Sequence, residues 1–227
     1  EYIGADPDEI VFVKNTTEGI NLIANGMREV ICGDEKILVS LDSHHSNILP
    51  FTERYKSQTV VCDDMLKELN KNKKKVGLVA LTGLSNVSGE EQIDLVKEIR
   101  KSGYDRAILV DAAQLVAHKR INVKEMNADF LVFSGHKIGA PMGIGVLYMS
   151  REWMEKIKPL NYGGEMVEGV EIDKEGAIMS DFSFGPQKFE GGTINMGGVA
   201  GLFAAIDFWR EYNGKNELFK ATDDLTH

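Results

Sequence analysis

Cysteine, long apolar runs and an excess of positive charge are all lacking in this sequence. The two cysteines, Cys32 and Cys62, form no CxxC pair or other metal-ligand spacing, which favours small apolar fillers in a reducing, cytoplasmic compartment. No apolar run approaches the length of a membrane span and no signal peptide opens the chain, which argues against a membrane protein. The formal net charge of −9 argues against a nucleic-acid partner, because like charges repel.

What the chain does contain is an alternation of apolar strand patterns and amphipathic helix patterns. Its 227 residues, 43% of them hydrophobic, suffice for one large α/β domain with a substantial core. Alternation of this kind predicts a mostly parallel sheet covered on both faces by helices, a three-layer sandwich. The expected strands cover residues 9–13, 36–41, 58–62, 76–84, 106–110, 130–133 and 144–148, and the expected helices cover residues 48–55, 65–75, 91–102, 151–158 and 197–212.

The stretch of residues 129–148 organises the rest of the chain. Two apolar runs flank Ser134-Gly135-His136-Lys137 and a Gly/Pro-rich turn, so the second run is expected to return antiparallel beside the first. Lys137 stands where the first strand ends, and a lysine amine forms a Schiff base with a carbonyl where the neutral amine is favoured. Ser134 and His136 could hold an anion such as phosphate. From these residues alone, a solvated lysine in a turn remains an open alternative.

A helix start follows the first expected strand. Asn15 or Thr16 is a good N-cap, and the free N–H groups and positive dipole end of such a helix bind phosphate. Simple capping is the alternative. In the next expected helix, residues 48–55, Pro50 is compatible only with a position near the first turn.

Polar residues also follow other expected strands. Asp111 comes directly after an apolar strand, so it is expected to be partly buried and to need a partner. Asn86 follows the strand of residues 76–84, at the edge where open α/β sheets bind ligands, although an asparagine there also forms turns. Of the adjacent pair His44 and His45, one side chain can face a site while the other faces away. A surface or N-cap position is the alternative for this pair.

Five motifs in order resemble the class V aminotransferase family of fold-type I enzymes, which use pyridoxal 5′-phosphate (PLP). They are VKNTTEGINLIANGM, DSHHSNILPF, LTGLSNVSGE, VDAAQ and SGHK with its GIGVLY continuation. The branch that the chain resembles most is the Suf-type cysteine desulfurase and selenocysteine lyase group. The resemblance runs over nearly the whole chain. It implies the PLP-dependent transferase fold of a large domain, with PLP as the cofactor.

The resemblance also implies roles for individual residues. Lys137 would carry PLP, Asp111 would pair with the protonated ring nitrogen, and His44 would stack on the ring as the third catalytic residue. Thr193 would reach the phosphate of the other subunit, which implies a homodimer with shared active sites. Ala112 stands where the family usually has Gly, and Ile194 where it has Pro. The implied cofactor-binding set is Thr16, Thr17, His44, Asn86, Asp111, Gln114, Ser134, His136, Lys137 and Thr193, with no metal.

The reaction that the resemblance implies is removal of sulfur from cysteine to give alanine, with an amino-acid substrate and a sulfur-acceptor protein as partners. In the family, the nucleophilic cysteine and the substrate-binding arginine lie in a C-terminal small domain. Residues 1–227 are expected to form the large domain alone, without that domain and without the N-terminal segment. A class V aminotransferase, a kynureninase- or epimerase-like lyase and an inactive PLP-binding module remain open as alternatives.

Overall fold

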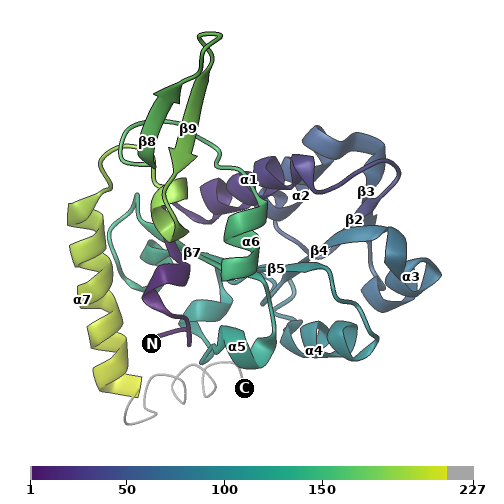
Figure 1. The fold of residues 1–227 in the computed structure, drawn as a ribbon. Helices are drawn as coiled ribbons and strands as arrows, with labels where there is room; N and C mark the ends of the chain where they lie inside the picture. Colours follow the sequence, from purple (N-terminus) through teal and green to yellow (C-terminus); the bar gives the residue numbers. More distant parts are fainter. Residues whose placement is uncertain (1, 214–227) are drawn as a thin grey trace.

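A seven-stranded sheet forms the centre of the computed structural model, which describes residues 2–213 (Figure 1). The strand order is β1-β7-β6-β5-β4-β2-β3, and the strands from β6 to β3 are parallel. In this sheet β7 is antiparallel to both of its neighbours, β1 and β6, as expected for the strand that returns after Lys137. The strands are β1 (Ile10–Val13), β2 (Lys36–Ser40), β3 (Thr59–Cys62), β4 (Val76–Thr82), β5 (Ala107–Asp111), β6 (Phe130–Ser134) and β7 (Gly145–Met149).

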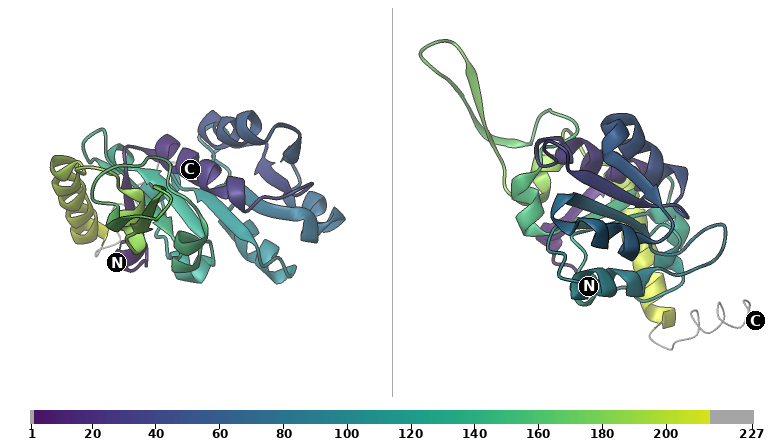
Figure 2. Two further views of the ribbon diagram at one scale, coloured as in Figure 1. Left: turned by 45° about the horizontal axis from the view of Figure 1, so that its top comes forward. Right: turned by 90° about the vertical axis from the view of Figure 1, so that its right-hand side faces the viewer.

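Helices cover both faces of the sheet, which confirms the predicted three-layer α/β class (Figures 1 and 2). Successive strand residues point to opposite faces, so Ile108 and Val110 belong to one core and Ala107 and Leu109 to the other. The first core includes side chains of α3 (Met65–Lys71), α4 (Ile93–Lys101), α5 (Val123–Met126) and α7 (Met196–Asn213). The second includes those of α1 (Thr16–Gly26), α2 (His45–Tyr55) and α6 (Arg151–Lys156).

Each expected strand lies within two residues of its observed bounds, but one helix start was wrong. α2 begins at His45, so Pro50 lies inside the helix and not in its first turn. A proline at this depth removes one backbone hydrogen bond. Its ring is buried against the core side of the helix, near Phe51 and Tyr55, so packing outweighs the local preference.

A two-stranded hairpin that the sequence did not lead us to expect projects from the body of the protein (Figures 1 and 2). It consists of β8 (Val167–Ile172) and β9 (Ile178–Phe182). Ile172 and Ile178 are directly paired, and their side chains are 71% and 69% exposed. The hairpin therefore has no packed face of its own along most of its length.

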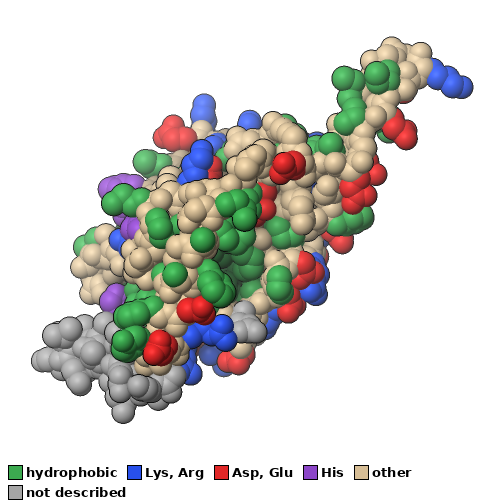
Figure 3. Space-filling model, turned by 90° about the vertical axis from the view of Figure 1, so that its left-hand side faces the viewer, with side chains coloured by type: hydrophobic (Ala, Val, Ile, Leu, Met, Phe, Trp, Pro, Cys, Tyr) green, Lys and Arg blue, Asp and Glu red, His purple; other side chains and the backbone are tan. Residues whose placement is uncertain are grey.

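α7 packs on the sheet through one side only. Leu202 is buried against the core, whereas Phe203 and Phe208 are exposed. An apolar cavity of about 270 Å³ lies between α7 and β1, and apolar side chains surround a hollow on this face (Figure 3). The indole N–H of Trp209 donates to the carbonyl of Ile138 (2.9 Å), which ties α7 to the turn that carries Lys137. Among the described helices, none is both long and apolar enough to span a bilayer.

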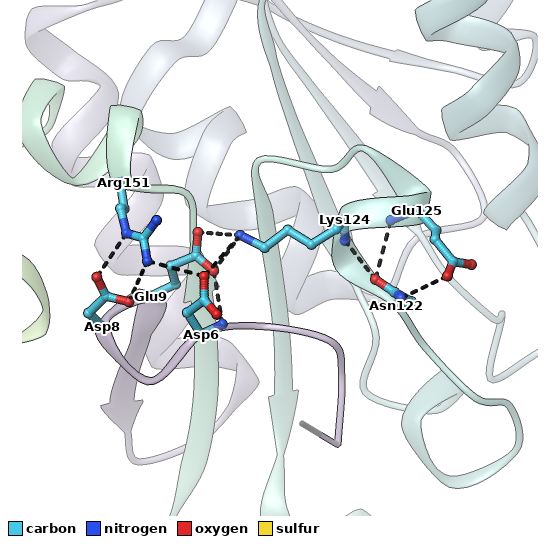
Figure 4. Close-up of polar contacts among 7 residues, drawn as sticks. All are labelled: Asp6, Asp8, Glu9, Asn122, Lys124, Glu125 and Arg151. Carbon is cyan, nitrogen blue, oxygen red and sulfur yellow. Dashed lines mark hydrogen bonds and ion pairs between the residues drawn. The ribbon is translucent and has the colours of Figure 1, made fainter.

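Ion pairs fasten the start of the chain to α5 and α6 (Figure 4). Glu9 is only 2% exposed, and Lys124 of α5 donates to both of its carboxylate oxygens. Arg151 of α6 pairs with Asp8 at 2.8 Å and with Asp6 at 3.1 Å, all three being exposed. The Glu9–Lys124 pair differs from the others because its carboxylate is buried.

Lys124→Met is expected to destabilise the fold by about 1–3 kcal/mol, because methionine keeps the aliphatic stem beside the Tyr148 ring and leaves the Glu9 charge buried without a cation. Urea unfolding measures the change. Arg151→Met is the control and is expected to have little effect, since exposed pairs contribute little. Equal losses in the two variants would show that burial of Glu9 is not the cause.

Candidate active site

A cavity of about 170 Å³ lies at the carboxyl edge of the parallel strands, the place where open α/β sheets bind ligands. It lies where β4, β5 and β6 end and where α1 and α2 begin. Every site residue predicted from the sequence lines it, with the exception of Thr193. The lining residues are Thr16, Thr17, His44, Ser46, Thr82, Leu84, Asn86, Asp111, Ala113, Gln114, Ser134, His136 and Lys137.

The first turn of α1 is drawn against the end of β6 by close packing. Asn15 is the N-cap, and its side chain accepts from the Glu18 N–H at 2.9 Å. A Cβ on Gly19 would lie 2.5 Å from Val132 of β6, so only glycine permits this approach. The start of α1 is thereby held beside Ser134.

Thr16 and Ser134 leave one hydroxyl proton for a ligand. The Thr16 N–H donates to Ser134 Oγ at 2.9 Å, and the two hydroxyl oxygens are 2.8 Å apart. Both side chains are buried. Whichever hydroxyl donates within the pair, the other hydroxyl keeps a proton that an acceptor can use. With Thr17 beside it at a helix N-terminus, this end of the cavity suits an anion.

Asp111, the last residue of β5, also lines the cavity. It is 5% exposed, and its Oδ1 accepts from the Ala113 N–H at 3.0 Å. Burial raises the pKa of Asp111 to about 6, while the Ala113 N–H and the neighbouring His44 and Lys137 act in the opposite direction. A buried carboxylate of this kind is stabilised by a cationic donor in the cavity.

Lys137 is exposed in a short turn, Gly135–Ile138, that follows β6. The turn is held by the Gly135 N–H, which donates to Ile144 at 2.9 Å, and it closes at Gly139 with φ of 88°. Within residues 2–213, Lys137 makes no salt bridge. Its amine is therefore available to a ligand in the cavity.

His44 both caps α2 and lines the cavity, so the capping alternative and the site assignment are compatible. Its Nδ1 accepts from the Ser46 N–H at 3.1 Å, and Ser46 Oγ lies 3.0 Å from the same nitrogen. The ring of His45 meets that of His44 edge-on, with 5.8 Å between ring centroids, and does not line the cavity.

Asn86 and Gln114 also line the cavity. Asn86 is exposed in a turn whose Val87 and Ser88 N–H groups donate to Ser85 Oγ, at 3.2 Å each. The Ser88 hydroxyl donates to Asp42 at 2.8 Å, which joins this turn to the segment that precedes His44.

Thr193 lies outside the cavity of its own chain. It lines a separate cavity of about 240 Å³ together with Glu190 and Asn195. Its loop is held in place by the Phe12 N–H, which donates to Glu190 Oε1 at 2.6 Å, and by Asn195 Nδ2, which donates to the Gly143 carbonyl at 3.1 Å. The loop is ordered by its own chain, with Thr193 exposed.

Sequence reasoning missed four lining residues: Ser46, Thr82, Leu84 and Ala113. Thr82 pairs in register with Asp111 at the ends of adjacent parallel strands, so correct alignment of the two strands would have found it. Ser46 lies two residues after His44, within the first turn of α2. The signal for Ser46 is its place in the motif DSHHSN, directly after the His44-His45 pair.

Comparison with known proteins gives consistent matches. The family model described as Aminotransferase class-V matches residues 1–226. A probable cysteine desulfurase of Halalkalibacterium halodurans is 36% identical over 96% of this chain and 55% of its own length. Another, of Pyrococcus abyssi, is 38% identical over 92% of this chain and 53% of its own length. The chain therefore spans about half the length of these curated relatives.

Solved structures agree. The apo structure of the cysteine desulfurase of Thermococcus onnurineus NA1 matches with a TM-score of 0.82 and 34% identity, over 96% of this chain and 55% of that one. A cysteine desulfurase of Escherichia coli matches with a TM-score of 0.80 and 31% identity, over 91% and 53%. These matches confirm the predicted fold and the resemblance. The chain belongs to the class V aminotransferase family.

Proposed function

We propose that this chain carries the PLP site of an enzyme that acts on an amino acid, removing sulfur from cysteine to give alanine. The observation that carries the proposal is the convergence of an available lysine amine, a buried carboxylate and an anion-suited helix start on one cavity. The relatives named as cysteine desulfurases support the choice of cysteine as the substrate.

The residues present fit PLP. Asp111 is a buried carboxylate with a single backbone donor, and a protonated ring nitrogen supplies the cation it lacks. Thr16, Thr17 and Ser134 supply hydroxyl groups for a phosphate, with His136 beside them. Lys137 is placed to attach an aldehyde covalently. Ala112, which stands in place of the usual glycine, is fully buried within the core and does not line the cavity.

PLP, when bound, supplies an electron sink for bonds at the substrate α-carbon. The residues of this chain do the rest. With PLP bound, Asp111 would keep the proton on the ring nitrogen, His44 would cover one face of the ring, and Asn86 and Gln114 would hydrogen-bond its polar groups. Lys137 would hold the cofactor, and its free amine would move protons as acid and base.

Neither cysteine of this chain is suited to take up sulfur. Cys32 is exposed, and burial is the main reason that the pKa of Cys62 rises to about 11, so its thiol stays protonated at neutral pH. Neither lines the cavity. We propose that residues 1–227 are the large domain and that a segment outside them supplies the nucleophilic cysteine and the arginine for the substrate carboxylate.

A cysteine-dependent sulfide assay on the full-length protein tests the reaction. With excess dithiothreitol present to reduce the enzyme-bound persulfide, we expect sulfide and alanine in equal amounts from cysteine, with far slower turnover of other amino acids. Transfer of an amino group to a 2-oxo acid, or cleavage of kynurenine, would assign a different class V reaction. PLP uptake without turnover of any amino acid would identify an inactive binding module.

Two further properties belong to this proposal. A sulfur-acceptor protein would receive the product sulfur, since a persulfide has to be discharged before the next cycle. A reducing cytoplasmic compartment suits the chain, because both of its cysteines are free thiols.

We also propose a C2 dimer in which Thr193 completes the phosphate site of the partner subunit. The exposure of Thr193 outside the cavity of its own chain supports this arrangement, and an isologous interface would make the exchange reciprocal.

Thr193→Ala is expected to weaken PLP binding about tenfold or more, because one hydrogen bond to a charged group is lost, while the dimer persists. Equilibrium dialysis and sedimentation of the full-length protein measure the two effects. A monomer with full PLP occupancy would contradict the shared site. A dimer whose Thr193→Ala variant binds PLP normally would remove Thr193 from it.

A further inference from the structure

Ser46 has no role in the site described so far, although it stands between two residues that do. It is a half-buried residue in the first turn of α2 and lines the cavity. Its hydroxyl oxygen lies 3.0 Å from His44 Nδ1 and 2.9 Å from Thr17 Oγ1. One side chain therefore joins the residue placed over the ring to a residue placed at the phosphate.

The backbone of Ser46 fixes the tautomer of His44. The Ser46 N–H donates to Nδ1 at 3.1 Å, so Nδ1 carries a lone pair. A neutral imidazole then has its proton on Nε2. The Ser46 hydroxyl is a second donor to Nδ1, and it competes with the backbone N–H for the single lone pair of that nitrogen. The hydroxyl can therefore leave Nδ1 without leaving that nitrogen unsatisfied.

The hydroxyl protons can be arranged in two ways. If Ser46 donates to His44, its oxygen accepts from Thr17, and Thr17 has no proton left for a ligand. If Ser46 donates to Thr17, the Thr17 proton is free to donate into the cavity. An ionised phosphate oxygen accepts hydrogen bonds and cannot donate them, so binding of such an oxygen at Thr17 favours the second arrangement.

We propose that Ser46 is a positioning residue that couples His44 to Thr17. Anion binding at Thr17 turns the Ser46 hydroxyl away from His44 Nδ1 and towards Thr17. The inference rests on the proposed function, in which the anion is the phosphate of PLP. Anion binding at the phosphate end of the site therefore changes the hydrogen bonding of His44 Nδ1.

Nitrogen-15 NMR of the full-length, PLP-free protein tests this relay, with inorganic phosphate as the probe. At pH 8, phosphate is expected to shift the Nδ1 resonance of His44. In Ser46→Ala that shift is expected to fall by half or more, and phosphate to bind about three- to tenfold more weakly. Ser46→Thr, which restores the hydroxyl, is expected to restore both.

Two further variants separate the relay from a general effect on folding. Ser43→Ala removes a neighbouring hydroxyl that contacts Asn47 and does not line the cavity, and it is expected to change neither readout. Thr17→Val is expected to abolish the Nδ1 response by itself, so a poorly folded Ser46→Ala variant would not end the test. In the Thr17→Val background, Ser46→Ala is expected to have no further effect on phosphate affinity.

Two results would overturn the proposed coupling of His44 to Thr17. One is an undiminished Nδ1 response in Ser46→Ala, and the other is an equal loss of phosphate affinity on Ser46→Ala in the wild-type and Thr17→Val backgrounds. The proposed function fails separately. If the relay responds to phosphate but the protein takes up no PLP, the relay stands without that function. If PLP binds and is turned over but the Nδ1 response is absent, the function stands without the relay.

Discussion

Replacing Lys137 with alanine is expected to lower turnover of the full-length protein at least about 10³-fold, because the covalent attachment of PLP and the proton transfers both depend on this amine. Lys137→Arg is not expected to rescue the loss, since a guanidinium stays protonated and cannot attach an aldehyde. Borohydride reduction of the PLP-loaded protein, followed by mass spectrometry, is expected to place the label on Lys137. The variant should lose the visible absorption of the attached cofactor.

Lys188 is the informative control. Burial lowers its pKa, so it is the other candidate for a reactive neutral amine, but its Nζ donates to the Met154 carbonyl at 2.7 Å and lies outside the cavity. Lys188→Gln is expected to keep both label and activity. Label on Lys188, or on any lysine other than Lys137, would show that the site is assigned to the wrong residue.

Asp111→Asn is expected to weaken PLP binding on the order of 10²-fold or more, because the protonated ring nitrogen would lose its anionic partner in a buried site. The same change is expected to stabilise the PLP-free protein by about 1–3 kcal/mol at pH 8, since asparagine removes the cost of a buried charge. Its amide oxygen can still accept from the Ala113 N–H. Function and stability are therefore expected to change in opposite directions.

The difference in unfolding free energy between Asp111→Asn and the wild-type protein is expected to depend on pH. The folded-state pKa of Asp111 is about 6, above the usual value of about 3.9 for the unfolded chain. The folded state therefore binds the proton more tightly, and the associated stability, present below pH 4, is lost as the pH rises through 6. Urea unfolding of the PLP-free proteins should show the advantage of Asp111→Asn narrowing from pH 8 to pH 4.5. A constant or widening difference would contradict the buried charge.

Strands and helices could be predicted from the sequence where the local hydrophobic pattern matches the burial that the fold imposes. The buried strands β5 and β6 are apolar up to their last residues, Asp111 and Ser134, so the sequence located each of them to within one residue. The hairpin could not be found in this way, because its strands, VEGVEI and IMSDF, mix apolar and polar residues and have no buried face. Pro50 was misplaced because a favourable buried contact overrode a backbone preference.

For the site, the residue types at strand ends were informative and the contacts between loops were not. Asp111 and Lys137 could be chosen because a charged residue after a buried strand demands an explanation. The Thr17–Ser46 contact joins two helix starts that are 29 positions apart, and only the packing of α1 against α2 brings them together. The role of each residue towards PLP remains a prediction until the variants are measured.

The bond from Thr16 to Ser134 spans 118 positions of the chain. Closing a contact of that length carries a large loop-closure cost, so we expect it to form late in folding, after the intervening strands and helices have docked. We therefore expect the hydroxyl pair at the start of α1 to be absent from a partly folded chain. The absorbance of PLP taken up during refolding would then report when the whole sheet is complete. The same absorbance, measured with and without a chaperone, would show whether this late step depends on it.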